Sequence, residues 1–322
     1  MEKRVRIADT ELSVSAIGLG TAMAGIHWDG AEADRIFDAF LDGGGNLIDT
    51  ARVYSDWIPP EIGRSERVLG DWFRREKKRG RVVLVTKGGH PEARGPGADV
   101  HVPRMTENDM RHDVEASLKA MGIDTIDVYL YHRDDRTQNA EEEIETMEKL
   151  RREGKIRYYG CSNWDADRIA AADGYARRMG YRGFVCDEAL LNAGVKYMKP
   201  PADDTLRAIR GDLRDYHVKN ERILAIAFTS VAGGFFHRFL SGGPQAVAGS
   251  PYCTEGNVRI AGRIGDLTRR YGVTVTQLLL AFLWVQPFPC VPLFGPHGME
   301  QLQDAMKAWD TAIPPDELAQ LL

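Results

Sequence analysis

The sequence of 322 residues predicts an α/β protein folded as a (β/α)8 barrel, the TIM-barrel architecture, because three observations agree. Apolar runs of strand length recur, each is followed by a segment with helical periodicity, and this alternation repeats eight times without a break. Such strands indicate a parallel sheet that is buried on both faces, and eight of these units close into a barrel. No linker divides the chain, so we expect residues 1–322 to form a single domain.

The predicted strands share an apolar composition and are separated by amphipathic helices. They are the runs SAIGLGT (15–21), NLIDTA (46–51), VVLVTK (82–87), IDVYLYH (126–132), YYGCSN (158–163), GFVCDEA (183–189), ILAIAFTS (223–230) and CVPLFG (290–295). The helix after the third strand begins at a capping-box-like pair, Thr106 and Asp109. A doubly wound open sheet is the alternative fold, but GLGTAM lacks the third glycine of a G-x-G-x-x-G turn.

Three additions to the repeating unit are expected. Residues 90–105 and 233–257 are Gly/Pro-rich insertions after the third and seventh strands, where loops shape the active-site face of a barrel. A short N-terminal β-hairpin, RVRI (4–7) with LSVS (12–15), is expected to close the opposite end. Two helices beyond the eight of the repeat complete the expected fold.

Composition excludes several classes of function. A hydrophobic content of 43%, a charged content of 28% and a net charge of −5 describe an ordinary soluble globular protein, so we expect no nucleic-acid partner. No apolar run approaches membrane-spanning length and the N-terminus has no signal-like apolar region, so we expect a cytoplasmic protein. Its four cysteines are widely spaced and no His/Cys pattern suits zinc, so we expect no metal.

Four polar side chains stand at or just after the ends of predicted strands: Asp49, Tyr54, Lys87 and His132. All four belong on one rim, because the carboxyl ends of parallel barrel strands open on the same face. Each has a structural explanation when taken alone, as a turn cap, a half-buried ring or a strand-end polar group. Lys87 is the hardest to explain that way, because it follows the apolar run VVLVT and needs a carboxylate partner such as Asp49.

Together these residues provide what carbonyl reduction needs: a proton donor, a charged pair that tunes it, and a second donor that orients the carbonyl oxygen. Free tyrosine has a pKa of about 10, so Tyr54 needs a nearby cation to bring its pKa closer to neutral pH. We expect Lys87 to be that cation.

Over almost its whole length, the chain resembles the aldo-keto reductase superfamily. The matching segments are IGLGT, NLIDTARVY, GRSERVLGDWF, VVLVTKGG, DMRHDVEASLKAMGIDTIDVYLYHRDD, LRREGKIRYYGCSN and GVTVTQLLLAFLWVQ. The resemblance implies a catalytic tetrad with Tyr54 as general acid/base, Lys87 and Asp49 as its tuning pair, and His132 as the carbonyl-orienting donor. It also implies direct hydride transfer with a nicotinamide cofactor, NAD(H) or NADP(H).

The resemblance carries the cofactor site over less completely. It implies that Ser162 and Asn163 hold the nicotinamide carboxamide and that residues 229–234 wrap the pyrophosphate. Asp187 stands where the family usually has a glutamine, and Leu190 where an aromatic ring commonly stacks. The expected cofactor contacts are Gly20, Thr21, Ser162, Asn163, Asp187, Phe228, Thr229, Ser230, Gly233, Gly234, Gly295, His297, Gln301 and Asp304. His297 and Ala305 replace the family's Arg/Lys and Asn at the adenosine end, which favours NAD(H) slightly over NADP(H).

The substrate is expected to be a small carbonyl compound, sugar-like, because Arg133 and its acidic neighbours can hydrogen-bond hydroxyl groups. Trp28, Trp57 and Trp164 lie in predicted loops on the same face, where they either form platforms for a sugar ring or pack the loops onto the barrel. Two other functions stay open: a non-redox acid/base enzyme that uses the same tetrad on a sugar, and a nucleotide-sensing accessory subunit. The sequence does not predict the oligomeric state.

Overall fold

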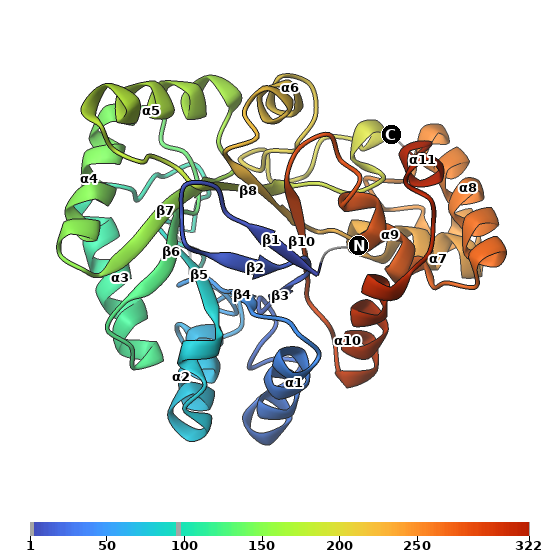
Figure 1. Cartoon of the computed structure of the whole chain (residues 1–322), viewed down its shortest axis with the longest axis horizontal. Helices are drawn as coiled ribbons and strands as arrows, with labels where there is room; N and C mark the ends of the chain where they lie inside the picture. The colour runs from blue at the N-terminus through green and yellow to red at the C-terminus, as the bar shows by residue number, and fades with distance from the viewer. Residues whose placement is uncertain (1–2, 95–97, 322) are drawn as a thin grey trace.

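The computed structural model describes residues 3–94 and 98–321, and these form a closed parallel barrel surrounded by helices (Figure 1). Its strands follow one another around the barrel in the order β10-β3-β4-β5-β6-β7-β8-β9. They are β3 (Gly18–Gly20), β4 (Leu47–Asp49), β5 (Val83–Gly88), β6 (Ile126–Tyr131), β7 (Ile156–Ser162), β8 (Cys186–Leu190), β9 (Leu224–Phe228) and β10 (Cys290–Phe294). Each predicted strand therefore coincides with an observed one, and the (β/α)8 prediction is confirmed.

Helices form the outer layer of the barrel (Figure 1). They are α1 (Gly30–Asp42), α2 (Arg64–Glu76), α3 (Glu107–Met121), α4 (Ala140–Arg152), α5 (Ala166–Met179), α6 (Asp212–Lys219), α7 (Phe235–Gly242), α8 (Glu255–Tyr271), α9 (Val275–Leu283), α10 (Met299–Met306) and α11 (Pro315–Ala319). The predicted capping box opens α3: the Thr106 side chain accepts a hydrogen bond from the backbone N–H of Asp109, whose carboxylate accepts one from the Thr106 N–H.

The N-terminal hairpin consists of β1 (Arg4–Arg6) and β2 (Ser13–Ser15), which pair antiparallel as expected. Its apolar side chains Ile7, Leu12 and Val14 are buried in a cluster with the interior side chains of the barrel. The Ser15 N–H donates to Asn46 Oδ1 at 2.6 Å, which ties the hairpin to the start of β4. The hairpin therefore fills the amino end of the barrel.

The connection between β9 and β10 is more ordered than the sequence analysis expected. We expected residues 233–257 to be a loop, but this region contains α7. The helix forms because Phe235 and Phe236 are fully buried, and the Phe235 ring stacks near Phe239 with centroids 5.9 Å apart. The described residues form eleven α-helices, three more than the eight of the repeat, where two extra helices were expected; α7 and the start of α8 lie in this region. The other insertion, 90–105, is irregular where it is described, and residues 95–97 lie outside the described part.

Within the described ranges, no helix combines the length and the apolar character needed to span a bilayer.

Candidate active site

The alternation of side chains along the strands brings the polar residues of the site into one layer. Leu47, Val85 and Leu130 belong to the cluster of side chains that fills the barrel interior. Asp49, Lys87 and His132 each stand two residues further along the same strand or just beyond it, so their side chains point to the same side. The same count of two from interior residues reaches Ser162, Glu188, Phe228, Gly20 and Gly295. This layer forms the carboxyl-end mouth of the barrel.

Lys87 is the centre of a buried network, and its side chain has no exposed surface. Its Nζ lies 2.6 Å from Asp49 Oδ2 and 3.0 Å from the Tyr54 hydroxyl oxygen. A third contact joins Nζ to the Thr50 carbonyl oxygen at 3.0 Å, and a fourth to Glu188 Oε1 at 3.1 Å. Three members of the expected tetrad are thus in direct contact. Glu188 is an additional partner that the sequence analysis did not identify.

Burial and neighbouring charges determine whether Lys87 and Tyr54 are protonated. Burial acts to lower the pKa of Lys87, but the charges of Asp49 and Glu188 outweigh it and hold the pKa above its usual value. Burial raises the pKa of Tyr54, and the Lys87 ammonium opposes that rise without cancelling it. The cation expected next to Tyr54 is therefore present, although the net shift of the tyrosine is upward. Both residues are protonated at neutral pH, so Tyr54 has a proton to give.

His132 completes the expected tetrad on the opposite wall. Its ring lies edge-on to the Tyr54 ring, with centroids 5.7 Å apart. Burial lowers the pKa of His132 well below its usual value, and the neighbouring His90, Arg133 and Lys87 lower it further. His132 is thus neutral, and a neutral imidazole can donate a hydrogen bond to a carbonyl oxygen without adding charge.

Asp49, Tyr54 and His132 of the tetrad line a cavity of about 290 Å³, and its remaining walls include six of the fourteen expected cofactor contacts. These are Gly20, Ser162, Asn163, Phe228, Thr229 and Gly295. Asn163 adopts a left-handed conformation with φ of 61°, and its Nδ2 donates to Ser162 Oγ at 3.0 Å and to the His132 carbonyl oxygen at 3.3 Å. Neutral polar groups beside a flat aromatic ring and two glycines fit a carboxamide-bearing planar ring.

Two residues of β8, Asp187 and Leu190, lie outside the tetrad cavity. Asp187 points outward, where its Oδ2 lies 2.9 Å from His217 Nε2 of α6, so it does not reach the cavity. The inward side chain at this level is Glu188. Leu190 lines a separate cavity, and the Phe228 ring lines the tetrad cavity together with the rings of Tyr54 and His132.

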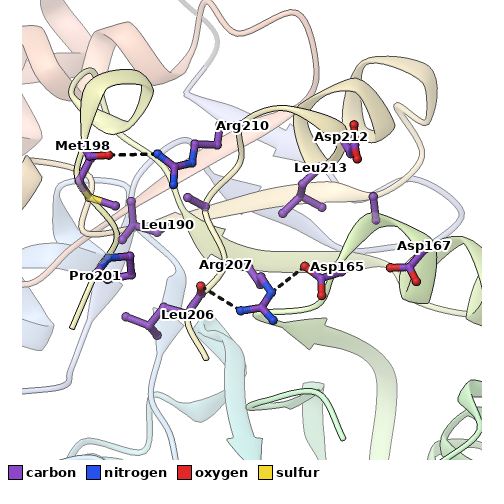
Figure 2. A pocket seen from close by; sticks show the side chains of 12 residues that line it. Asp165, Asp167, Leu190, Met198, Pro201, Leu206, Arg207, Arg210, Asp212 and Leu213 are labelled. Atoms are coloured by element: carbon purple, nitrogen blue, oxygen red, sulfur yellow. Dashed lines mark hydrogen bonds and ion pairs between the residues drawn. The ribbon is translucent and has the colours of Figure 1, made fainter. Parts of the chain in front are cut away.

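This second cavity, of about 450 Å³, lies between the starts of α5 and α6 and the segment 198–210. Figure 2 shows Leu190, Leu206 and Met198 along one side of it and the ion pair between Arg207 and Asp165, whose Nε and Oδ1 are 2.6 Å apart, along another. Leu206 also lines the tetrad cavity, so one side chain is shared by both cavities.

The tryptophans expected as substrate platforms divide into two groups. Trp28 is buried against Phe37 and its Nε1 donates to the Pro296 carbonyl oxygen at 3.0 Å. Trp164 is buried, and its Nε1 donates to the Arg133 carbonyl oxygen at 2.9 Å. Both pack loops onto the barrel, so the platform interpretation is wrong for them. Trp57 is 45% exposed but lines none of the cavities described here.

Arg133, the fourth expected substrate contact, does line the tetrad cavity. Its guanidinium donates to Asp203 Oδ2 at 3.1 Å, to Thr205 Oγ1 at 2.9 Å and to the His132 carbonyl oxygen at 2.9 Å. These contacts use one hydrogen of each nitrogen, and a guanidinium carries five N–H hydrogens. Two donors therefore remain for a ligand.

The rest of the expected cofactor residues lie outside this cavity, and several have structural contacts. Thr21 Oγ1 donates to the Asp49 carbonyl oxygen at 2.8 Å, and Ser230 Oγ to the Leu293 carbonyl oxygen at 2.5 Å. Asp304 accepts from Thr274 and Gln277. At the start of α10, Gln301 accepts from the His297 N–H at 2.9 Å. Gly233 and Gly234 have left-handed φ values of 57° and 76° after β9; the space beside Gly233 is open, and the Arg238 guanidinium lies beside Gly234.

His90 is a residue whose role the sequence did not indicate. It lies in the first insertion, with its ring centroid 4.7 Å from that of His132 and its Nδ1 2.8 Å from the Pro91 carbonyl oxygen. Burial, reinforced by Arg133, lowers the pKa of His90 to about 4. A neutral His90 therefore packs against the His132 ring without placing a charge beside it.

Within residues 3–94 and 98–321, no group of three or more His, Cys, Asp or Glu side chains is arranged to hold a metal ion.

Sequence comparison decides which family contains this site. The profile of the aldo/keto reductase family matches residues 16–321, which is nearly the whole chain. The chain belongs to the aldo/keto reductase family. As a member of that family it is an NAD(P)-dependent oxidoreductase that interconverts a carbonyl compound and an alcohol.

Two of the relatives named here match this aldo/keto reductase over most of both chains, and a third matches over half of this chain. It is 28% identical to the uncharacterized oxidoreductase YrpG of Bacillus subtilis over 97% of this chain and 92% of that protein. It is 26% identical to an aryl-alcohol dehydrogenase [NADP(+)] of Phanerodontia chrysosporium, covering 95% and 81% of the two chains. Half of the chain is 35% identical to norsolorinic acid reductase B of Aspergillus parasiticus, over 41% of that protein.

Proposed function

We propose that this aldo/keto reductase reduces an oxygen-substituted aldehyde or ketone, with Tyr54 as the group that protonates the carbonyl oxygen. The observation that carries the proposal is the contact of the Tyr54 hydroxyl with Lys87, which is itself held by Asp49, at a cavity that His132 also lines. Phe228, Ser162 and Asn163 would hold a nicotinamide cofactor in this cavity, and the cofactor would supply the hydride in reduction and accept it in oxidation.

The protein's own groups account for the proton transfer. A carbonyl oxygen between Tyr54 and His132 accepts hydrogen bonds from both, and negative charge on this oxygen strengthens both bonds. Tyr54 then releases its proton to the oxygen. The resulting phenolate faces the Lys87 ammonium at the 3.0 Å contact, and Asp49 keeps that ammonium in place. Oxidation of an alcohol follows the same contacts in reverse.

Replacement of Tyr54 tests the role directly. Tyr54→Phe should lower kcat by at least about 100-fold, the contribution typical of a positioned acid, and leave nucleotide affinity nearly unchanged. Ser65, which is buried behind the site and bonds Thr21 and Thr50, is a reference position: Ser65→Ala should retain most of the activity. Turnover by Tyr54→Phe at the wild-type rate would contradict the assignment.

The lining of the cavity narrows the substrate class. Ala22, Met23, Leu206 and Leu293 provide apolar walls, and Arg133 offers two hydrogen-bond donors near the tetrad. These features favour a flat carbonyl compound with a hydroxyl or carboxylate beside the carbonyl group. Two relatives are named for aryl-alcohol and norsolorinic acid substrates, which agrees with an aryl carbonyl. The sugar-like substrate expected from the sequence is the second candidate, because Arg133 also suits hydroxyl groups.

A paired substrate panel separates these candidates. 2-Hydroxybenzaldehyde, benzaldehyde and a set of aldoses should be compared by kcat/KM with the wild type and Arg133→Met. We expect the hydroxylated aryl aldehyde to be preferred over benzaldehyde by about tenfold, the value of one charged hydrogen bond, and the preference to disappear in Arg133→Met. Higher kcat/KM for the aldoses would favour the sugar-like substrate.

We also propose that NAD(H) is accepted at least as well as NADP(H). His297, near the start of α10, packs its ring 4.2 Å from that of His27, and burial followed by His297 lowers the pKa of His27. This pair offers no permanent cation to a 2′-phosphate. One relative is named for NADP(+), so calorimetric titration with NAD⁺, NADH, NADP⁺ and NADPH is the deciding measurement. An affinity for NADPH more than about tenfold above that for NADH would contradict the proposal.

A further inference from the structure

A second carboxyl group, Glu188, shares the Lys87 ammonium with Asp49. Both carboxyl side chains are 2% exposed, and the Lys87 side chain is fully buried. Asp49 and Glu188 are also within hydrogen-bonding reach of each other. Two ionised carboxylates in contact in a buried site repel strongly, and a single ammonium cannot compensate both. One of the two carboxyls must therefore keep its proton.

The contacts indicate which carboxyl this is. Lys87 Nζ is closer to Asp49 (2.6 Å) than to Glu188 (3.1 Å). Glu188 Oε2 is buried and has no hydrogen-bond partner among the described residues as long as it is only an acceptor. A proton on Glu188 gives this carboxyl group a donor, and Asp49 is the acceptor side chain within its reach. Burial raises the pKa of both carboxyls; the charge of Lys87 is the largest effect opposing this at Asp49, whereas the charge of Asp49 adds to it at Glu188 and raises that pKa well above its usual value.

We propose that Glu188 is a permanently protonated carboxyl that donates a hydrogen bond to Asp49 and accepts one from Lys87. It is a positioning residue, because it acts on Tyr54 through Lys87. The assignment of its position in the reaction rests on the function proposed above. A neutral Glu188 leaves Asp49 and Lys87 as one balanced pair, so the phenolate that forms on Tyr54 is not opposed by a second buried anion.

The other charged or titratable groups around Glu188 agree with this balance. They come from every strand or loop that faces it: Asp49 on β4, Tyr54 after β4, Lys87 on β5, Arg133 after β6 and Cys186 on β8. Arg133 is already paired with Asp203. Burial raises the pKa of the Cys186 thiol well above its usual value, so that group stays neutral. Lys87 is then the one cation in direct contact with Glu188 among the described residues.

Two substitutions distinguish a neutral Glu188 from a charged one. Glu188→Gln preserves both a donor and an acceptor and should keep kcat within about threefold of the wild type, with an unshifted pH profile. Glu188→Met has a similar size but neither group. It should lose about 10- to 100-fold in kcat, the value of a hydrogen bond to a charged group, with unchanged nucleotide affinity. Asp187→Asn is the matched control, since it changes an adjacent buried carboxyl on β8 that faces His217 and should leave the pH profile unchanged.

Infrared spectroscopy tests the protonation without any turnover. The difference spectrum between wild type and Glu188→Gln at pH 7.5 should show the loss of one protonated carboxylic acid band. Loss of a carboxylate band instead would overturn the proposal. So would an acid shift of about one pH unit or more in the Glu188→Gln rate profile, because removal of a contacting anion shifts a pKa by that amount. Full activity of Glu188→Met would overturn the positioning role. Because the infrared result is independent of activity, it distinguishes failure of this proposal from failure of the proposed reaction.

Discussion

Removal of the Lys87 ammonium should make the stability of this protein strongly dependent on pH. In Lys87→Met the side chain keeps its approximate size, but Asp49 and Glu188 lose the cation that lies 2.6 and 3.1 Å from them. Their pKa values, already raised by burial, then rise further. A carboxyl whose pKa is higher in the folded than in the unfolded state destabilises the fold as pH rises above the unfolded value.

The magnitude follows from the number of protons that must be bound. In Lys87→Met both Asp49 and Glu188 must bind a proton in the folded state. For the carboxyl that is ionised in the wild type, the free energy of unfolding should fall by about 1.4 kcal/mol with each pH unit above its pKa in the unfolded chain. The cost should stop rising near about 3–5 kcal/mol, where one carboxyl ionises without a partner. Urea unfolding at pH 5 and pH 8 measures both limits. Asp49→Asn in the same background should restore most of the loss at pH 8, because it removes the group that must ionise. A Lys87→Met loss that is equal at both pH values would refute this account of the cluster.

Three further predictions concern residues outside the tetrad. Burial raises the pKa of Glu66 to about 7, so the fold loses stability between pH 4.5 and 7; the loss is roughly 3 kcal/mol, and Glu66→Gln should abolish this slope in urea melts. Trp164→Phe should cost about 1–3 kcal/mol through the lost bond to Arg133, with kcat/KM nearly unchanged; a selective rise in KM at full stability would restore the platform interpretation. A Cβ at Gly160 would lie 2.4 Å from the Cys186 carbonyl oxygen, so Gly160→Ala should cost more than about 2 kcal/mol. In α8 a Cβ at Gly262 meets nothing within 4 Å, so Gly262→Ala should raise the unfolding free energy by about 0.5–1 kcal/mol and serves as its control.

The tetrad could be predicted from the sequence because its members occupy positions that the chain order alone fixes. Asp49 and Lys87 end apolar runs, and His132 follows one, so a barrel brings all three to one mouth whatever the details of packing. Tyr54, five residues after Asp49, lies in the short loop that leaves the same strand end. The structure joins three of these side chains directly around Lys87.

Glu188 could not be distinguished from Asp187 in the same way. The strand Cys186–Leu190 is buried on both faces, so apolar alternation does not reveal which of its two consecutive acidic residues points inward. The register decides it: Asp187 pairs with Cys161 on β7 and turns to His217, whereas Glu188 joins the interior layer. The roles of Trp28 and Trp164 could not be decided from the sequence for a related reason. A loop position does not show whether a large ring packs onto the barrel or faces its mouth.

The N-terminal hairpin limits how ligands enter and leave. Ile7, Leu12 and Val14 fill the amino end of the barrel. We therefore expect nucleotide and carbonyl compound to enter from the carboxyl end. The groups expected around the nicotinamide, such as Ser162 and Phe228, lie in the same narrow chamber as Tyr54. The ligand that binds second should therefore hinder release of the ligand that bound first. Steady-state inhibition patterns should accordingly show ordered rather than random binding of nucleotide and carbonyl compound.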